Sequence, residues 1–486
     1  MWSDPQIAKS IEDSIRTGLN RLNVDWEQDI APWLGDEIGL GISNISLAPN
    51  APSSTPASVA MVIATRDTAK SDALLAKLRV KLQSNGVKLD DQTYRNVATV
   101  EQTAAGPGGG IAYATVNGLV IVANGSEELH GAVDATLDGK GLDKSSKYQA
   151  TLSKLRGGRA ATVYLNADAL IKPILDSLKT GLSPAFLVLS SGLDAQGFGL
   201  GLTFQPNGLL AEFITSGSAT TKLPVEEKTG SKAVSNPNRM LRAVPDTTLL
   251  YASGRRLSDA FSDLLTALKL LDPRSADSLG KFEREAGIDL QKDIISWMTG
   301  EAAFAVVPGA GLIGSGASPV DVALIVEAGD KQVAEAGTHK LIQALAAQSG
   351  GKVGDVTVGD NRLHALLDFG GNPSLVYGLI GDNFVLASSQ SAARAIASAG
   401  SSPLADAKDF KEAVAPLPGN NIGYVYFKPK LLVDYLTVLS SLGNQKCDAC
   451  TVLAPLRALA FTIEYPPSEP GAIRSALFML LDTAKK

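Results

Sequence analysis

The chain contains few of the residues that most often hold metals or act as nucleophiles. Its 486 residues include two cysteines, three histidines and only 6% aromatic residues. A structural zinc site uses about four clustered ligands, and a serine or cysteine nucleophile is usually activated by a neighbouring base. His130, His339 and His364 fall in separate predicted elements, and no G-x-S-x-G sequence occurs. We therefore expect each histidine to be a surface or hydrogen-bonded residue, and neither a metal nor a cofactor to be bound.

Clusters of positive charge are also lacking. The net charge is −6, and the Lys and Arg residues are spread along the chain. Binding to nucleic acid or to an anionic membrane surface requires clustered basic side chains. This distribution of charge argues against a nucleic-acid partner.

Long apolar runs are absent as well. No run reaches the roughly 18 residues of a membrane-spanning helix. Residues 1–10 lack the basic start and apolar core of a signal peptide. Taken alone, these features predict a soluble chain, and its length predicts two to four domains.

Two segments of the chain resemble each other closely. Residues 24–37 read VDWEQDIAPWLGDE, and residues 288–301 read IDLQKDIISWMTGE. Further matches follow in the same order along the chain, which favours a tandem duplication of a whole domain over a solenoid of short repeats. The matched residues are Asp25 with Asp289, Asp29 with Asp293, Ile30 with Ile294, Trp33 with Trp297, Glu37 with Glu301, Lys77 with Lys340, Tyr113 with Tyr377, Val163 with Val425 and Tyr164 with Tyr426.

The second copy has the clearer pattern of elements. Apolar residues at helical or alternating spacing predict many strands joined by short turns. Such connections favour a mostly antiparallel sheet, so the predicted fold class is α+β, with helices packed on one face of each sheet. Strands are expected at 244–253, 301–307, 320–326, 356–360, 362–367, 374–388, 422–427 and in a hairpin over 458–482; helices are expected at 257–271, 289–298, 333–348, 391–399, 409–417 and 429–442.

The predicted domains are a first repeat over residues 1–219, a polar linker over 220–238 and a second repeat over 239–486. Only residues 1–23 precede Val24, whereas the second repeat places a strand and a helix before Ile288. We therefore expect the first repeat to lack its opening strand, and the chain to be incomplete at its N-terminus. A missing strand leaves a sheet edge unpaired, which native proteins avoid.

The sequence DIAPWLGDE resembles a motif of domain-of-unknown-function family 3352, a family of uncharacterised bacterial cell-envelope proteins. The residues that carry the resemblance are Asp29, Ile30, Pro32, Trp33, Leu34, Gly35, Asp36 and Glu37. The second copy departs from the motif, with Ser296 in place of Pro32 and Thr299 in place of Gly35. The resemblance implies an extracytoplasmic protein, in the periplasm or at the cell surface, held to the membrane by an N-terminal segment absent from this chain. It implies no activity.

The repeated motif is expected to be structural. Ile30 and Trp33, or Ile294 and Trp297, share one face of a short helix and would anchor it in the core. Capping accounts for Asp25 and Asp289, because a carboxylate oxygen accepts hydrogen bonds from free helix N–H groups. The acidic group of Asp25, Asp29, Asp36 and Glu37 lacks the ligand spacing and glycine turn of a calcium loop. We assign Asp25, Asp29, Trp33, Glu37, Asp289, Asp293, Trp297 and Glu301 to this structural motif.

Two glycine-rich segments could suggest nucleotide binding. Residues 309–314 read GAGLIG and match G-x-G-x-x-G, but a strand follows them instead of the helix that would face a pyrophosphate. Residues 104–110 lack the Lys and Ser/Thr of a phosphate-binding loop. We predict flexible loops, no bound nucleotide, and a fold that tolerates serine in place of the glycines at 309–314.

Cys447 and Cys450 form a C-x-x-C pair. They could contribute to a zinc site, but no second pair is present. A redox pair normally opens a helix after a strand, whereas this pair follows a helix. A local disulfide suits an oxidising compartment, and two free thiols are a further possibility. The disulfide is our prediction.

These observations favour a non-enzymatic envelope protein that binds or scaffolds an unknown protein, lipid or apolar ligand at the membrane surface. Duplicated sheets can present paired concave surfaces for such binding. The alternative is a hydrolase-like enzyme whose site assembles from polar residues distant in sequence. An apolar groove would favour binding, whereas convergent carboxylates or a Ser–His contact would favour the enzyme.

Overall fold

The structure is a computed structural model of residues 1–486. The structural description below concerns residues 24–43, 57–103, 110–167, 195–217, 237–255, 257–259, 261–262, 265–266, 273–311, 318–368, 370–442, 447, 450, 453–464 and 472–482.

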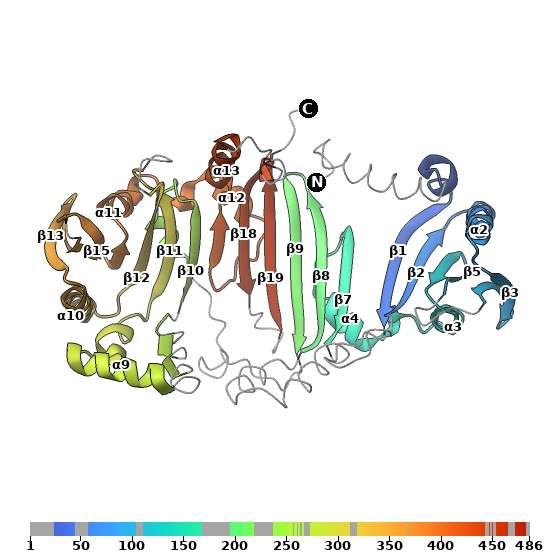
Figure 1. Cartoon of the computed structure of the whole chain (residues 1–486), viewed down its shortest axis with the longest axis horizontal. Coiled ribbons are helices and arrows are strands. Elements are labelled where there is room, and N and C mark those ends of the chain that lie inside the picture. The colour runs from blue at the N-terminus through green and yellow to red at the C-terminus, as the bar shows by residue number, and fades with distance from the viewer. Residues whose placement is uncertain are drawn as a thin grey trace. The chain divides into compact units, whose positions relative to one another are not determined.

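The chain divides into two compact units, which are described separately (Figure 1). The first unit contains residues 2–153 and 164–181, and the second contains residues 154–163 and 182–486. The predicted boundary at 220–238 therefore differs from the spatial division of the chain. The cause is strand pairing, because strands from the first half of the sequence complete the sheet of the second unit.

The first unit contains a six-stranded antiparallel sheet in the order β1-β2-β6-β5-β4-β3. Its strands are rich in β-branched residues, which fit a pleated surface. The β5–β6 turn contains Asn117 and Gly118, both with positive φ, as a two-residue hairpin requires. The elements are η1 (Trp26–Ile30), β1 (Leu34–Ser43), β2 (Ser58–Thr65), α2 (Thr68–Ser84), β3 (Leu89–Tyr94), β4 (Val97–Gln102), β5 (Ala112–Val116), β6 (Leu119–Ala123), α3 (Ser126–Leu137), η2 (Leu142–Lys144) and α4 (Ser146–Leu152).

Helices cover both faces of this sheet, and the prediction of helices on one face is wrong. Ile121 of β6 packs with Leu129 and Val133 of α3. Its neighbour Val120 points to the other face and packs with Leu74 of α2. Successive strand residues point to opposite faces. An apolar run such as LVIVA in β6 therefore needs an apolar partner on each side.

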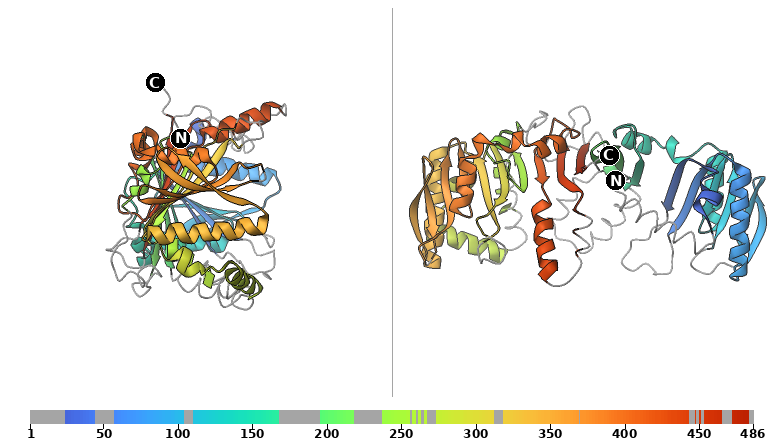
Figure 2. Two further views of the ribbon diagram at one scale, coloured as in Figure 1. Left: turned by 90° about the vertical axis from the view of Figure 1, so that its left-hand side faces the viewer. Right: turned by 90° about the horizontal axis from the view of Figure 1, so that it is seen from above.

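The second sheet has thirteen strands in the order β13-β14-β15-β16-β12-β11-β10-β17-β18-β19-β9-β8-β7. Helix α10 packs across β13 to β16 (Figure 2), while α11 and α12 cover the opposite face. The elements are β7 (Ala161–Asn166), β8 (Ala195–Gln205), β9 (Gly208–Gly217), η3 (Arg239–Arg242), β10 (Leu250–Arg255), α9 (Pro273–Ala286), η4 (Leu290–Ile295), β11 (Glu301–Pro308), β12 (Val320–Glu327), α10 (Lys331–Ser349), β13 (Lys352–Val358), β14 (Asn361–Leu367), β15 (Pro373–Ile380), β16 (Asn383–Ala387), α11 (Gln390–Ala397), η5 (Ala399–Ser401), η6 (Leu404–Asp406), α12 (Lys408–Val414), β17 (Tyr424–Phe427), α13 (Lys430–Leu442), β18 (Leu456–Glu464) and β19 (Ile473–Leu481).

The two sheets contain the same run of strands. The first sheet has the order β1-β2-β6-β5-β4-β3, and the second includes β11-β12-β16-β15-β14-β13. The first sheet ends at β1, where Ile38 pairs with Ile63 of β2. The second continues past β11, because β10 pairs with β11 on one side and with β17 on the other.

Several predicted elements need adjustment. The strand expected at 244–253 is β10, which begins later, and α9 was not predicted. Only parts of the helix expected at 257–271, and residues 237–238 of the linker, lie within the described residues. Residues 309–311 follow β11, which pairs antiparallel with β12, and the rest of the segment predicted as a hairpin loop, 312–314, lies outside the described residues. The expected tolerance to serine fails at Gly309, where an added Cβ would lie 2.4 Å from the Ser318 carbonyl oxygen.

Candidate functional site

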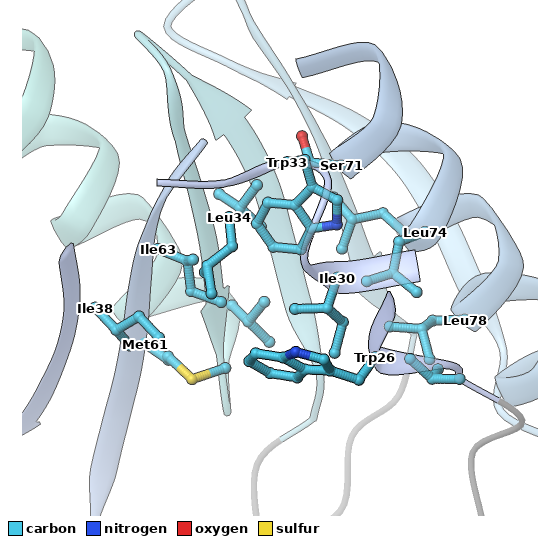
Figure 3. Close-up of a pocket in the computed structure, with 14 residues that line it drawn as sticks. Trp26, Ile30, Trp33, Leu34, Ile38, Met61, Ile63, Ser71, Leu74 and Leu78 are labelled. Carbon is cyan, nitrogen blue, oxygen red and sulfur yellow. The ribbon is translucent and has the colours of Figure 1, made fainter. Parts of the chain in front are cut away.

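An apolar pocket of about 240 Å³ opens in the first unit between the sheet and α2 (Figure 3). Its walls come from η1, β1, β2, β6 and α2, so secondary structure positions most of the lining. The Trp26 indole extends from η1 toward Met61 of β2, and Leu78 of α2 closes the opposite side. The lining residues are Val24, Trp26, Ile30, Trp33, Leu34, Ile38, Met61, Ile63, Ser71, Leu74, Leu75, Leu78, Val120 and Val122.

The pocket has almost no hydrogen-bonding capacity. Ser71 is its only residue with a hydroxyl or charged side chain, and that hydroxyl already donates to the Thr68 carbonyl oxygen at 3.0 Å. Trp33 is 4% exposed, and its Nε1 donates to the Asp29 carbonyl oxygen at 2.5 Å. The arrangement suits an apolar group that needs no polar anchor.

The repeated aspartates build the wall that carries Trp26 and Ile30. Asp25 Oδ1 accepts a hydrogen bond from the Gln28 backbone N–H at 2.8 Å, and Asp29 Oδ2 accepts one from the Asp25 backbone N–H at 2.7 Å. This reciprocal cap satisfies N–H groups at the start of η1. The Lys77 ammonium lies 2.6 Å from Asp29 Oδ2, and its hydrogen bond is the main reason that the Asp29 pKa lies below the ordinary value. These residues position the pocket wall.

The second unit repeats this cap. Asp289 Oδ1 accepts from the Lys292 backbone N–H at 2.9 Å, and Asp293 Oδ2 accepts from the Asp289 backbone N–H at 3.0 Å. Lys340 Nζ lies 4.0 Å from Asp293 Oδ2, as Lys77 lies near Asp29. The structure therefore gives Asp25, Asp29, Asp289 and Asp293 a common role.

In the second unit, a larger side chain occupies the space beside the matching tryptophan. Trp297 is 2% exposed, and its ring lies 5.1 Å from that of Phe384 on β16. Phe384 pairs with Val326 in the register in which Val120 pairs with Ile63. Val120 thus holds the matching position in the first unit, and its smaller side chain leaves room there.

Glu37 and Glu301, the last matched pair of the motif, have different surroundings. Glu301 is fully buried, and its carboxylate accepts hydrogen bonds from the backbone N–H groups of Arg239 at 2.7 Å and Met240 at 3.2 Å. Burial raises the Glu301 pKa. Glu37 is exposed, and no described residue donates to its carboxylate.

A polar pocket of about 260 Å³ lies elsewhere in the first unit, around Glu101 and His130. Glu101 Oε1 accepts from Thr99 Oγ1 at 2.6 Å and lies 2.9 Å from His130 Nε2. Burial raises the Glu101 pKa, but hydrogen bonds from Ser126, Thr99 and His130 outweigh it and leave the pKa below the ordinary value. An ionised, saturated carboxylate is a poor general acid or base. The pocket is lined by Asp90, Gln92, Thr93, Glu101, Gln102, Thr103, Ser126 and His130.

Two histidines that the sequence separates meet in the second unit. The rings of His339 on α10 and His364 on β14 lie 4.4 Å apart. His339 Nδ1 lies 3.0 Å from the Tyr377 hydroxyl, and His364 Nδ1 lies 2.9 Å from Asp355 Oδ1. The prediction that the histidines are hydrogen-bonded agrees with these contacts. Their positions in separate predicted elements suggested three isolated side chains, whereas His339 and His364 lie next to each other. The sequence held one signal of this cluster: the hairpin predicted over the β14–β15 region pairs His364 with Tyr377.

The remaining features of the described residues favour no other site. Within them, no group of three His, Cys, Asp or Glu residues is arranged to hold a metal ion. No helix among them is long and apolar enough to cross a membrane. Cys447 and Cys450 are joined by a disulfide. The glycine-rich segment at 104–110 falls mostly outside the described residues.

Comparison with known proteins identifies one family. The family model described as "Protein of unknown function (DUF3352)" matches residues 3–481, nearly the whole chain. The resemblance of the DIAPWLGDE motif to this family is thereby confirmed. No curated protein and no solved structure matches the chain.

Proposed function

Because the chain belongs to this family of proteins of unknown function, we propose from its geometry that the first unit binds an apolar ligand in the Trp26–Trp33 pocket without catalysing a reaction. The observation that supports this proposal is the apolar lining of the pocket. Two indoles and a set of aliphatic side chains surround about 240 Å³, and the single hydroxyl among them is already satisfied. Such a site gains affinity by removing apolar surface from water.

The pocket volume indicates the size of the ligand. A dry apolar cavity of about 150 Å³ holds a benzene molecule, so this pocket accommodates one aromatic ring or the end of an acyl chain. Drug-sized ligands occupy pockets of roughly 300–1,000 Å³. A lipid or acylated partner would therefore insert a chain end here and keep its polar part outside.

We also propose that the two units descend from one duplicated domain. Support comes from the shared strand order, the two reciprocal Asp caps and the matched lysines beside them. In this proposal the second copy closed its pocket with Phe384, whereas the first copy retains Val120. Duplication would thus have let one copy keep binding while the other became structural.

The chain supplies its own test of the pocket. The Val120→Phe variant carries the second unit's residue and should fill the pocket beside Trp33. We expect it to weaken decanoate binding at least tenfold, measured by equilibrium dialysis and tryptophan fluorescence, with little change in thermal stability. Val80→Phe is the matched control, because Val80 lies 67% exposed on α2 and does not line the pocket. Undiminished decanoate binding by the Val120→Phe variant would sink the proposal.

We propose an extracytoplasmic location for the protein, in the periplasm or at the cell surface. The resemblance to envelope proteins supports it, as does the Cys447–Cys450 disulfide, because disulfides persist in oxidising compartments. Protease accessibility in intact spheroplasts tests the location. Protection of the chain until the inner membrane is lysed would contradict it.

A hydrolase-like enzyme is the second candidate, and the polar pocket around Glu101 is the observation that favours it. Ser126 opens α3 and His130 lies one turn later, but both bond to Glu101 rather than to each other. A serine without a neighbouring base is a weak nucleophile. Labelling of Ser126 by a fluorophosphonate, lost in the Ser126→Ala variant, would favour the enzyme over the binding protein.

A further inference from the structure

Strand β1 ends its sheet with an exposed apolar edge. Among the described residues it pairs only with β2. Ile38, Leu40 and Ile42 lie on one face of β1 and are 58%, 64% and 54% exposed. The strand contains no Lys, Arg or Pro, and its charged residues, Asp36 and Glu37, lie near its start. The apolar part from Ile38 to Ile42 therefore lacks the charges and prolines that usually protect an edge from further pairing.

The second unit shows what occupies this position beside β11. Strand β10 pairs antiparallel with β11, from Leu250 opposite Val306 to Arg255 opposite Glu301. Tyr251, in the middle of β10, is fully buried. The edge of β1 that no other described residue pairs with is therefore the edge that β11 uses for a six-residue strand.

A second observation, the exposed carboxylate of Glu37, points to the same edge of β1. In the second unit, buried Glu301 accepts backbone N–H groups from η3, the segment that precedes β10. Glu37 is at the matching place in β1 and is exposed without such donors among the described residues. An anion at this point has charge complementarity with backbone N–H groups and with a basic residue opposite it.

We propose that the free edge of β1 binds an extended segment of a partner protein as an added antiparallel strand. The segment carries apolar side chains on alternate residues and a basic residue opposite Asp36 and Glu37, as Arg255 lies opposite Glu301. Its backbone would pair with the free N–H and C=O groups of β1, which is the mode called β-augmentation. The register rests on the proposed duplication, whereas the open edge does not.

A second copy of this chain fits the edge less well. Two β1 strands paired antiparallel about Leu40 would join their apolar faces, but each Glu37 would lie opposite Ser43 of the other copy. Neither carboxylate would then meet a basic residue. The acidic end of β1 favours a basic partner segment instead.

The chain's own sequence provides a probe. A synthetic peptide with the sequence of residues 239–256, RMLRAVPDTTLLYASGRR, contains η3, β10 with its final Arg255, and the arginine that follows. Hydrogen–deuterium exchange of the full chain is measured with and without excess peptide. We expect exchange over residues 37–43 to slow by about tenfold or more, because pairing protects the amides of a strand. Exchange over β11 should not change, since β11 is already paired on both sides.

Three variants locate the contact. Glu37→Gln removes the charge and should weaken peptide binding about tenfold, since charged hydrogen bonds are roughly twice as strong as neutral ones. Leu40→Lys places a charge on the exposed edge and should abolish protection of β1. Val80→Lys is the matched control on the exposed face of α2 and should have no effect. Because all three positions are exposed, the thermal midpoints should stay close to that of the parent chain.

Four outcomes would overturn the proposal. The first is unchanged exchange over residues 37–43 in excess peptide, and the second is equal protection by a peptide whose terminal arginines are glutamates. The third is slow exchange without peptide at every chain concentration, since the chain would then cover its own edge. The fourth is protection that rises with chain concentration, since a second copy would then occupy it. Decanoate binding tests the pocket separately, so each proposal can fail alone.

Discussion

His339 and His364 belong to a network that also contains Tyr377, Asp355 and Gln343. Each histidine Nδ1 has a partner, and Gln343 Nε2 lies 2.8 Å from His339 Nε2. Burial lowers the His339 pKa below 6.5, and the neighbouring His364 lowers it further. The network thus stabilises a neutral imidazole between α10 and the sheet.

This network predicts a pH dependence of stability in the second unit. Since the folded state binds a proton at His339 more weakly than the unfolded state does, the stabilisation is complete above pH 6.5 and is lost as pH falls through the lower folded pKa. The urea midpoint of the second unit should therefore fall with pH below 6.5. The His339→Gln variant should show a shallower fall, while His130→Gln in the first unit should leave it unchanged. A midpoint that rises on acidification would contradict the assignment.

At the scale of elements, η1 and η4 show how a short sequence specifies a local structure. In D-x-x-x-D, the first aspartate's carboxylate accepts from the backbone N–H three residues later, and the second aspartate's carboxylate accepts from the backbone N–H of the first. The tryptophan anchors the turn in the core. Only nearby atoms are needed, so spacing alone predicted the cap. Glu301 has its role only after η3, distant in sequence, folds against it.

The predicted disulfide lies in the connection between α13 and β18. Cys447 and Cys450 are bonded across a loop of four residues. So small a loop restricts the unfolded chain little, and its closure contributes about 2 kcal/mol. Protein matured outside the cytoplasm should resist alkylation at both thiols by mass spectrometry. The Cys447→Ser/Cys450→Ser pair should lower the free energy of unfolding by no more than about 2 kcal/mol, and alkylation of both native cysteines would show that the bond does not form in the cell.

At the scale of the whole chain, the sheet of the second unit depends on strands from the first half of the sequence. Residues 208–215 of β9 pair with residues 473–480 of β19. Leu210 of β9 is 1% exposed within the main core. The sequence repeat therefore does not mark where the chain can be cut.

A fragment comparison tests this dependence. Residues 195–486 retain β8 and β9, whereas residues 239–486 lose them and expose the apolar edge of β19. Removing buried leucine and isoleucine contacts costs a few kcal/mol, which predicts a melting temperature lower by roughly 5–10 °C for the shorter fragment. Differential scanning calorimetry provides the measurement. Equal melting temperatures for the two fragments would mean that β9 contributes little to this sheet.

Local sequence by itself determined the α+β class, the antiparallel hairpins, the Asp caps and the buried tryptophans Trp33 and Trp297. Each depends on alternation, helical spacing or hydrogen bonds between near neighbours, which one chain segment contains within itself. Tertiary structure alone decided that helices cover both sheet faces, that β9 pairs with β19 and that His339 lies beside His364. It also decided that the small Val120 side chain leaves a pocket in the first unit, whereas Phe384 occupies the matching position in the second. These features depend on residues far apart in sequence and on the volumes that remain after packing, and periodicity carries no information on either.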